Sequence, residues 1–212
     1  MELRFRDEKL VLLPERALYL PQYRMLVVAD VHIGKSAHFR KEGLIMPAVS
    51  SAADLDLVGA LCYRYEVSDV LFLGDLFHSR FNSEWFLFEN FLHKHPDLHI
   101  ILAKGNHDIL PEFLLEESNV VLADSFVAGD LLFTHHPLEA PVPGTLNIAG
   151  HIHPGCLLRN KGFQSYRLPC FYFCDNVLLL PAFGSLTGMH MVRKTEGARI
   201  FPVFKDEVLE QP

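Results

Sequence analysis

Five apolar segments of this chain are each followed at once by residues that bind metal ions in proteins. The donor groups are carboxylates, an amide oxygen and imidazoles, a mixture that suits manganese, iron(II) or zinc rather than calcium. No thiolate is among them, which argues against a structural zinc site. We expect these side chains to meet at the carboxyl ends of a sheet. In chain order the donors are Asp30, His32, Asp75, Asn106, His135, His151 and His153.

Seven donors are too many for one catalytic ion that keeps open positions, but they fit two ions that share a bridging carboxylate. Two ions roughly 3.5–4 Å apart can hold a bridging hydroxide and stabilise both oxygens of an in-line displacement at phosphorus. The Asp-x-His pair at 30–32 and the His-x-His pair at 151–153 put alternate side chains on one side, so both members can reach one cluster. The pattern therefore predicts phosphoester hydrolysis at a two-metal site.

Apolar periodicity predicts the elements that carry these donors. Ser51 and Asp54 resemble a capping box at the start of the first helix. Helices are expected at 50–65, 83–93 and 111–118. A hairpin or two edge strands are expected at 10–13 and 17–20, and further strands at 24–29, 67–73, 100–103, 120–122, 130–134 and 145–149. Beyond residue 153 only β character follows, at 166–173, 176–180 and 199–203, which predicts a second sheet within one domain spanning 1–212.

The composition is that of an ordinary globular protein, with 50% apolar and 21% charged residues. A formal net charge of −7 argues against a broad basic surface for duplex nucleic acid, and favours flexible or single-stranded ends. The amino terminus lacks a secretory signal, and no apolar stretch approaches the roughly 20 residues that span a bilayer. We therefore expect a cytoplasmic protein without membrane contact, and reduced structural thiols at Cys62, Cys156, Cys170 and Cys174.

The motifs in their order resemble those of the calcineurin-like metallophosphoesterase superfamily. The second motif is most similar to that of the nucleases of double-strand-break repair, and the Asp-Arg-Gly of the protein phosphatases is absent. The motifs are Asp30-x-His32, Gly74-Asp75-x-x-His78, Gly105-Asn106-His107-Asp108, His135 and Gly150-His151-x-His153.

Further segments resemble the bacterial ligase-associated DNA damage response phosphoesterases/endonucleases. Members of that group accompany a DNA ligase, a helicase and an exonuclease-like protein, so a ligase and a helicase are the implied partners. One departure is Met189-His190, where the resemblance leads us to expect a further glycine. The segments are 30–35, 39–40 with Gly43 and Pro47, 168–171, 180–184 and 187–188.

The resemblance implies an α/β fold, a four-layer αββα sandwich of two mixed sheets. It also implies two divalent metal ions, with manganese expected and iron or zinc as alternatives. By position, one ion would take Asp30, His32 and His153, the other would take Asn106, His135 and His151, and Asp75 would bridge them. His135 is preferred to His136 because the ligand of the family is the first residue after the strand.

Five further residues are expected to act on the substrate. His107 is the expected general acid at the leaving oxygen, with Asp108 as its orienting partner, and His78 is expected to contact the phosphate. Lys35 and Arg40 lie in a basic loop that leaves directly from the expected site, so they are candidate substrate contacts.

The predicted function is hydrolysis of a phosphodiester by a metal-activated hydroxide, in a DNA-repair-associated endonuclease or phosphodiesterase. A small-molecule or cyclic-nucleotide phosphodiesterase, or a phosphomonoesterase, would use the same site with a different pocket wall. A non-catalytic scaffold is a second alternative, but such relatives lose ligands that are all present here. An accessory role in a repair complex, active only with its partners, is the third.

Overall fold

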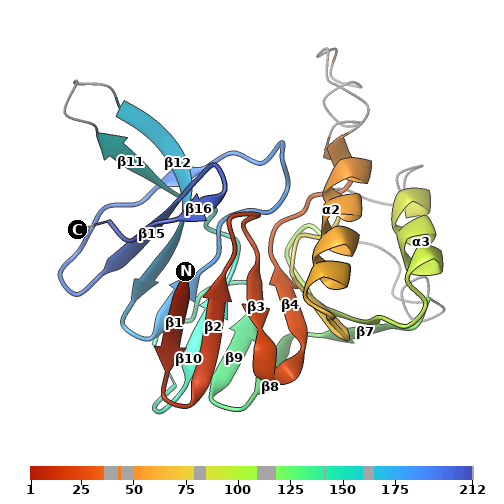
Figure 1. Cartoon of the computed structure of the whole chain (residues 1–212), viewed down its shortest axis with the longest axis horizontal. Coiled ribbons are helices and arrows are strands. Elements are labelled where there is room, and N and C mark those ends of the chain that lie inside the picture. The colour runs from red at the N-terminus through yellow and green to blue at the C-terminus, as the bar shows by residue number, and fades with distance from the viewer. Residues whose placement is uncertain are drawn as a thin grey trace.

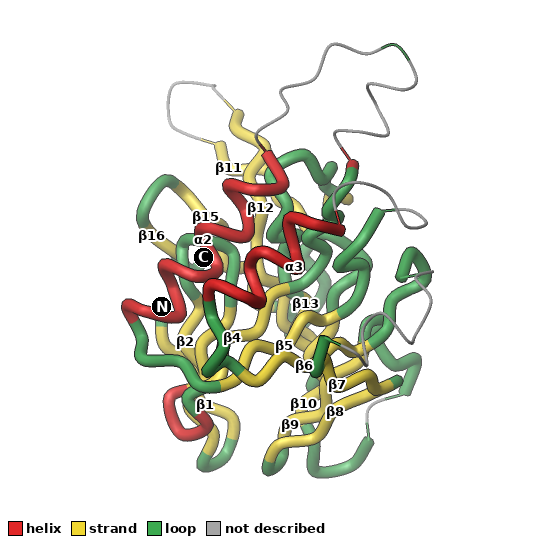
Figure 2. Tube along the Cα trace, turned by 90° about the vertical axis from the view of Figure 1, so that its right-hand side faces the viewer, coloured by secondary structure: helices red, strands yellow, loops and turns green. Residues whose placement is uncertain are grey.

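The structure is a computed structural model that describes residues 1–35, 43, 50–78, 85–108, 118–140, 142–159 and 165–211. Two mixed β-sheets pack face to face (Figure 1). Helices α2 (Ser50–Arg64) and α3 (Trp85–Lys94) pack against the outer face of the first sheet (Figure 2). The α/β class with two mixed sheets is therefore confirmed. Within the described ranges no helix covers the second sheet, so the fourth layer is not found there.

The first sheet has seven strands in the order β1-β2-β3-β4-β5-β6-β7. Pairing is antiparallel from β1 to β4 and parallel from β4 to β7. The expected hairpin is β2–β3, and both of its strands lie inside the sheet, so the edge-strand alternative is wrong. The strands are β1 (Glu2–Phe5), β2 (Glu8–Leu12), β3 (Leu18–Leu20), β4 (Met25–Val28), β5 (Asp69–Leu73), β6 (His99–Ala103) and β7 (Val120–Ala123), with the 3₁₀ turn η1 (Pro21–Tyr23) before β4.

The second sheet runs in the order β14-β11-β12-β13-β10-β9-β8, and β15 pairs with both β12 and β16. It already begins at residue 125, so the expectation that all donor-bearing strands share one sheet is wrong. His190, where a glycine was expected, begins β14. The strands are β8 (Ser125–Ala128), β9 (Leu131–Thr134), β10 (Leu146–Ala149), β11 (Pro154–Arg159), β12 (Ser165–Cys174), β13 (Val177–Leu179), β14 (His190–Met191), β15 (Arg199–Phe204) and β16 (Glu207–Val208).

The central strands are buried on both faces, which explains their unbroken apolar runs. On β4, Leu26 and Val28 pack in the cluster under the two helices, whereas Val27 packs between the sheets. Phe133 and Phe171 from the second sheet fill the same inter-sheet cluster. Burial of each such side chain stabilises the fold by about 1.5–3 kcal/mol. This core fixes one sheet against the other.

Asp54 of α2 joins the helix to the segment that follows β13. Its Oδ2 accepts the Ser185 N–H at 3.1 Å and the Ser185 hydroxyl at 3.2 Å. Burial raises the pKa of Asp54, and these two hydrogen bonds oppose the rise. Both bonds go to a residue far along the chain, a contact that the sequence pattern around Asp54 did not predict. The two hydrogen bonds to Ser185 matter for the site because the preceding residue, Gly184, donates its N–H to the Asp30 carbonyl at 3.2 Å.

Two expectations concern residues that lie outside the described ranges. The helix expected at 111–118 has only Ser118 within the described residues, and Arg40 lies outside them. None of the described helices has the length and apolar character needed to cross a membrane.

Candidate metal centre

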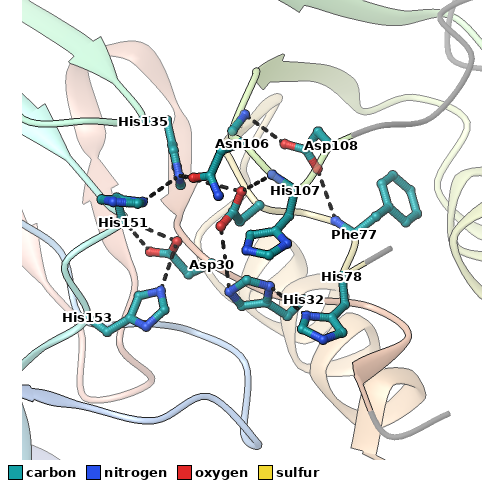
Figure 3. A network of polar contacts seen from close by, with 12 residues as sticks. Asp30, His32, Phe77, His78, Asn106, His107, Asp108, His135, His151 and His153 are labelled. Atoms are coloured by element: carbon teal, nitrogen blue, oxygen red, sulfur yellow. Dashed lines mark hydrogen bonds and ion pairs between the residues drawn. The ribbon is translucent and has the colours of Figure 1, made fainter. Parts of the chain in front are cut away.

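The five donor-bearing strands end at one place, although they belong to two sheets. β4, β5 and β6 reach it from the first sheet, and β9 and β10 reach it from the second. Figure 3 shows the side chains that follow these strands turned toward a common centre. The structure therefore brings together all seven residues that the sequence singled out as metal ligands.

One group of donors, here called the Asp30 position, consists of Asp30, His32 and His153. One ligand atom from each of these residues lies within 4.8 Å of the others. Asp30 is completely buried, and its Oδ1 lies 3.2 Å from His153 Nε2. Its carboxylate also accepts the backbone N–H of His151 at 3.0 and 3.2 Å (Figure 3). A buried carboxylate facing two imidazoles is a suitable set for one divalent ion.

A second group, here called the Asn106 position, consists of Asn106, His135 and His151. His135 Nε2 lies 3.2 Å from Asn106 Oδ1 and 3.2 Å from His151 Nδ1. His135 Nδ1 lies 3.0 Å from the carbonyl oxygen of Leu73, which can only accept. Nδ1 therefore carries the ring proton, and in the neutral ring Nε2 turns its lone pair toward the other donors. A backbone carbonyl that fixes the tautomer in this way is the usual support of a metal-binding histidine.

Asp75 lies between the two positions and is 2% exposed. Its Oδ2 is 3.8 Å from His32 Nε2, and its Oδ1 is 3.5 Å from His135 Nε2. Oδ1 also accepts the backbone N–H of His107 at 2.9 Å. The two oxygens of one carboxylate thus face the two donor groups, as a bridging ligand requires.

Two buried imidazole nitrogens of the centre lack a partner among the described residues, and a bound cation would be such a partner. Nε2 of His32 and Nε2 of His153 are buried and have no hydrogen-bond partner among the described residues, although carboxylate oxygens lie nearby. Burial, helped by the charge of Lys35, lowers the pKa of His32 to about 2. Burial also lowers the pKa of His151. Polar groups without partners are costly to bury, and imidazole nitrogens with carboxylate oxygens are ligands of divalent ions, so the donor set fits divalent metal ions.

The backbone at the centre adopts the left-handed conformation at five of the seven donors. This conformation costs non-glycine residues roughly 1–2 kcal/mol each, and such residues gather at functional sites. It turns successive side chains of a short loop into one centre, which an extended strand would not do. The φ angles are 56° at Asp30, 52° at His32, 48° at Asp75, 64° at His151 and 51° at His153.

Two glycines make room for the donors. A Cβ on Gly74, which has a φ of +75°, would lie 2.1 Å from His135 Nδ1. A Cβ on Gly184 would lie 2.3 Å from the carbonyl oxygen of Val31 and 3.0 Å from that of Asp30. Glycine is therefore required at both points by close approach, and the sequence reading gave Gly184 no such role.

Three of the residues expected to act on the substrate, His78, His107 and Asp108, lie beside the donors (Figure 3). The His107 ring lies 5.5 Å from the His32 ring and 5.6 Å from the His78 ring, measured between centroids. His78 Nδ1 is 3.5 Å from His32 Nδ1. Asp108 accepts the N–H of Gly105 at 2.9 Å and of Phe77 at 3.1 Å. Its two oxygens thus bind the loop backbone, which joins the loop of His107 to that of His78.

Lys35 and His136 lie at the rim. Lys35 is half-buried, and burial lowers its pKa while the charges of Asp30 and Asp75 oppose that shift. His136 is exposed, whereas His135 is buried and faces the other donors.

Asn147 is a site residue that the sequence reading missed. It is completely buried, and its amide donates to the Leu132 carbonyl at 3.2 Å and to the Thr134 hydroxyl at 2.8 Å. Its Oδ1 accepts the N–H of Leu138 at 2.9 Å. These bonds hold the turn that carries His135. A polar residue inside the apolar run 146–149 was the signal that could have revealed it.

Comparisons with known proteins identify the family to which the chain is similar. The family model for calcineurin-like phosphoesterases matches residues 23–188, which contain every donor. The crystal structure of the Pseudomonas putida nuclease MPE superposes with a TM-score of 0.81 at 29% identity, covering 100% of this chain and 99% of that one. The phosphoesterase Yfce from E. coli gives a TM-score of 0.48 at 11% identity, over 88% of this chain and 97% of that one. No match was found among curated protein sequences. The family model and the similarity to the nuclease MPE confirm the resemblance that the motifs indicated.

Substitution of Gly184 by alanine should disturb the Asp30 position more than the fold. The new Cβ would meet the carbonyl oxygens of Val31 and Asp30, so the loop must shift, whereas a Cβ on Gly188 has nothing within 4 Å. We expect Gly184→Ala to weaken Mn²⁺ binding by on the order of 10–100-fold, the range for lost support of a metal site. Gly188→Ala is the matched control. Equal Mn²⁺ affinities of the two variants by calorimetry would contradict the prediction.

Metal ions should stabilise the folded chain. Because the converging donors lack a cation in the metal-free protein, Mn²⁺ at about 100 times its Kd should raise the free energy of unfolding by about 2.7 kcal/mol. The measurement is the melting temperature of chelator-treated protein with and without MnCl₂. Asp75→Asn, which removes the central charge, should lose most of the shift, and an undiminished shift in this variant would contradict the assignment.

Proposed function

The chain belongs to the calcineurin-like phosphoesterase family, and from this premise we propose that it is a nuclease that hydrolyses DNA phosphodiesters with two divalent metal ions. The observation that carries the proposal is the place of Asp75, whose two oxygens face the two donor groups. Similarity over the whole chain to a Pseudomonas putida nuclease supports a nucleic-acid diester as the substrate. A metal-dependent phosphoesterase is the coarser statement on which this proposal builds.

In this proposal, the Asp30 position would hold one ion, the Asn106 position would hold the other, and Asp75 would serve as a ligand of both. When bound, the ions supply a nucleophilic water at neutral pH and neutralise charge on the phosphate oxygens. Manganese is the proposed metal, with iron or zinc as alternatives, because oxygen and imidazole donors are mixed. The carboxylates of Asp30 and Asp75 are positioned before the substrate binds, because backbone N–H groups donate hydrogen bonds to both of them.

His107 is the proposed general acid. Its backbone N–H is anchored on Asp75, and its half-buried ring stands beside the donors, where a leaving oxygen would emerge. Donation of an imidazole proton to the leaving alkoxide would complete cleavage of the phosphorus–oxygen bond. Asp108 orients His107 through the loop backbone that it binds, and His78 contacts the phosphate from the opposite loop.

Positively charged side chains at the rim of the centre would attract phosphate to a protein whose net charge is negative. We propose that the amine of Lys35, which lies near Asp30 and Asp75, contacts the substrate phosphate. Arg40, which lies outside the described residues, is the second proposed contact. With a net charge of −7, the chain has little basic surface for a long duplex, which favours short or single-stranded segments.

The wider role proposed is DNA repair in the cytoplasm, beside a DNA ligase and a helicase. This part rests on the sequence motifs that extend beyond the metal centre. We also propose that residues 1–212 act as one domain, because one inter-sheet cluster takes side chains from both sheets.

The test is cleavage of defined substrates by the purified protein with Mn²⁺. End-labelled single-stranded and hairpin DNA are compared with bis-p-nitrophenyl phosphate and p-nitrophenyl phosphate, using Asp75→Asn as the control. We expect DNA cleavage that this variant lacks. Hydrolysis of the small diester with intact DNA would favour the alternative, a phosphodiesterase for small or cyclic nucleotides. Turnover of the monoester alone would reject a diesterase.

Loss of the His107 imidazole should slow the chemical step. We expect His107→Ala to lower kcat by on the order of 10²–10⁴-fold, with metal content unchanged by elemental analysis. His99→Ala is the matched control, because its exposed ring pairs with Asp69 at the amino ends of the parallel strands. An unchanged kcat in metal-loaded His107→Ala would remove this residue from the mechanism.

A further inference from the structure

Two adjacent histidines follow β9, and only the first has a role in the proposed site. The His136 ring lies 4.8 Å from the His135 ring and 4.0 Å from the His151 ring, measured between centroids. Ligand nitrogens of these three residues lie within 4.8 Å of one another. We propose that His136 is a further, exchangeable ligand of the ion at the Asn106 position. The inference rests on the proposed two-metal function and adds a ligand that its motifs do not contain.

The backbone that carries His136 is fixed, as a ligand requires. The Thr134 hydroxyl donates to the His136 carbonyl at 2.7 Å and itself accepts from the buried amide of Asn147. The His135 carbonyl accepts the N–H of Gly150 at 3.1 Å, which joins this turn to the loop of His151. The imidazole of His136 therefore stands on a held turn at the open rim, while its side chain remains exposed.

The distances permit one ion to bind all three rings. Because each metal–nitrogen bond is about 2.0–2.1 Å, two nitrogens on one ion are at most about 4.2 Å apart. The nitrogens of His135 and His151 already lie 3.2 Å apart. Because the His136 side chain is exposed, its rotation can cover the remaining difference.

The number of donors explains why this ligand would be exchangeable. Asn106, His135, His151 and one oxygen of Asp75 give an ion four protein ligands, which leaves two of six positions open. His136 would fill one of them, so a phosphate oxygen would compete with it for that place. The ring can leave easily because it is exposed, unlike the buried ring of His135. Three imidazoles would also make this position richer in nitrogen than the Asp30 position.

The experiment titrates metal-free protein with Co²⁺, followed by visible absorbance and calorimetry. His136→Ala is compared with wild type, with His135→Ala as a variant of the Asn106 position and with His99→Ala as the control for loss of an exposed ring. We expect two binding events in wild type, and one of them weakened by on the order of tenfold in His136→Ala. Inorganic phosphate should bind several-fold more tightly to the Co²⁺-loaded His136→Ala protein.

The outcomes separate this inference from the proposed function. Unchanged Co²⁺ affinity in His136→Ala, with one event lost in His135→Ala, would overturn the inference and leave the two-metal proposal standing. Weaker phosphate binding in His136→Ala would also overturn it, because His136 would then contact the substrate. A single event in wild type would overturn both. Equal melting temperatures of metal-free wild type and His136→Ala establish that the variant is folded.

Discussion

Two carboxylates, Asp30 and Asp75, are buried among imidazoles, and this unbalanced charge is what the rest of the structure must accommodate. They are 0% and 2% exposed. An isolated ionised carboxylate is very costly to bury. Backbone N–H groups of His151 and His107 reach the carboxylates, and Lys35 stands near them, but the low pKa of His32 keeps that ring neutral. Divalent cations would balance the charge, so the loops are arranged for a metal-loaded protein.

Both donor groups depend on how the two sheets pack together. The Asp30 position takes Asp30 and His32 from the first sheet and His153 from the second, and the Asn106 position is likewise divided. The inter-sheet core therefore sets the distance between the halves of each position. The left-handed backbone at five donors is a local cost, and burial of large side chains such as Phe133 offsets it. A rigid core thus supports strained loops.

Local features of the fold could be predicted from the sequence, whereas contacts between distant segments could not. Apolar runs with polar ends located the central strands and the donors, because each of those signals lies within a few residues. The division of these strands between two sheets was not predicted, since pairing partners are distant in the chain. The bond between Asp54 and Ser185 spans 131 residues, so no local pattern in the sequence could predict it. The short strands β14 and β16 carry too few residues to show a period.

The His151-x-His153 pair shows how a local rule fails where the backbone is strained. Alternation along a strand predicts that residues two apart point to the same side. Here His151 faces His135, whereas His153 faces Asp30, because both residues have positive φ angles and lie after the end of β10. One short loop therefore supplies a residue to each of the two donor groups. The same loop binds Asp30 through the His151 N–H, so displacement of residues 150–153 must change both positions together. Coupling of this kind favours a centre that assembles as one unit rather than two independent sites.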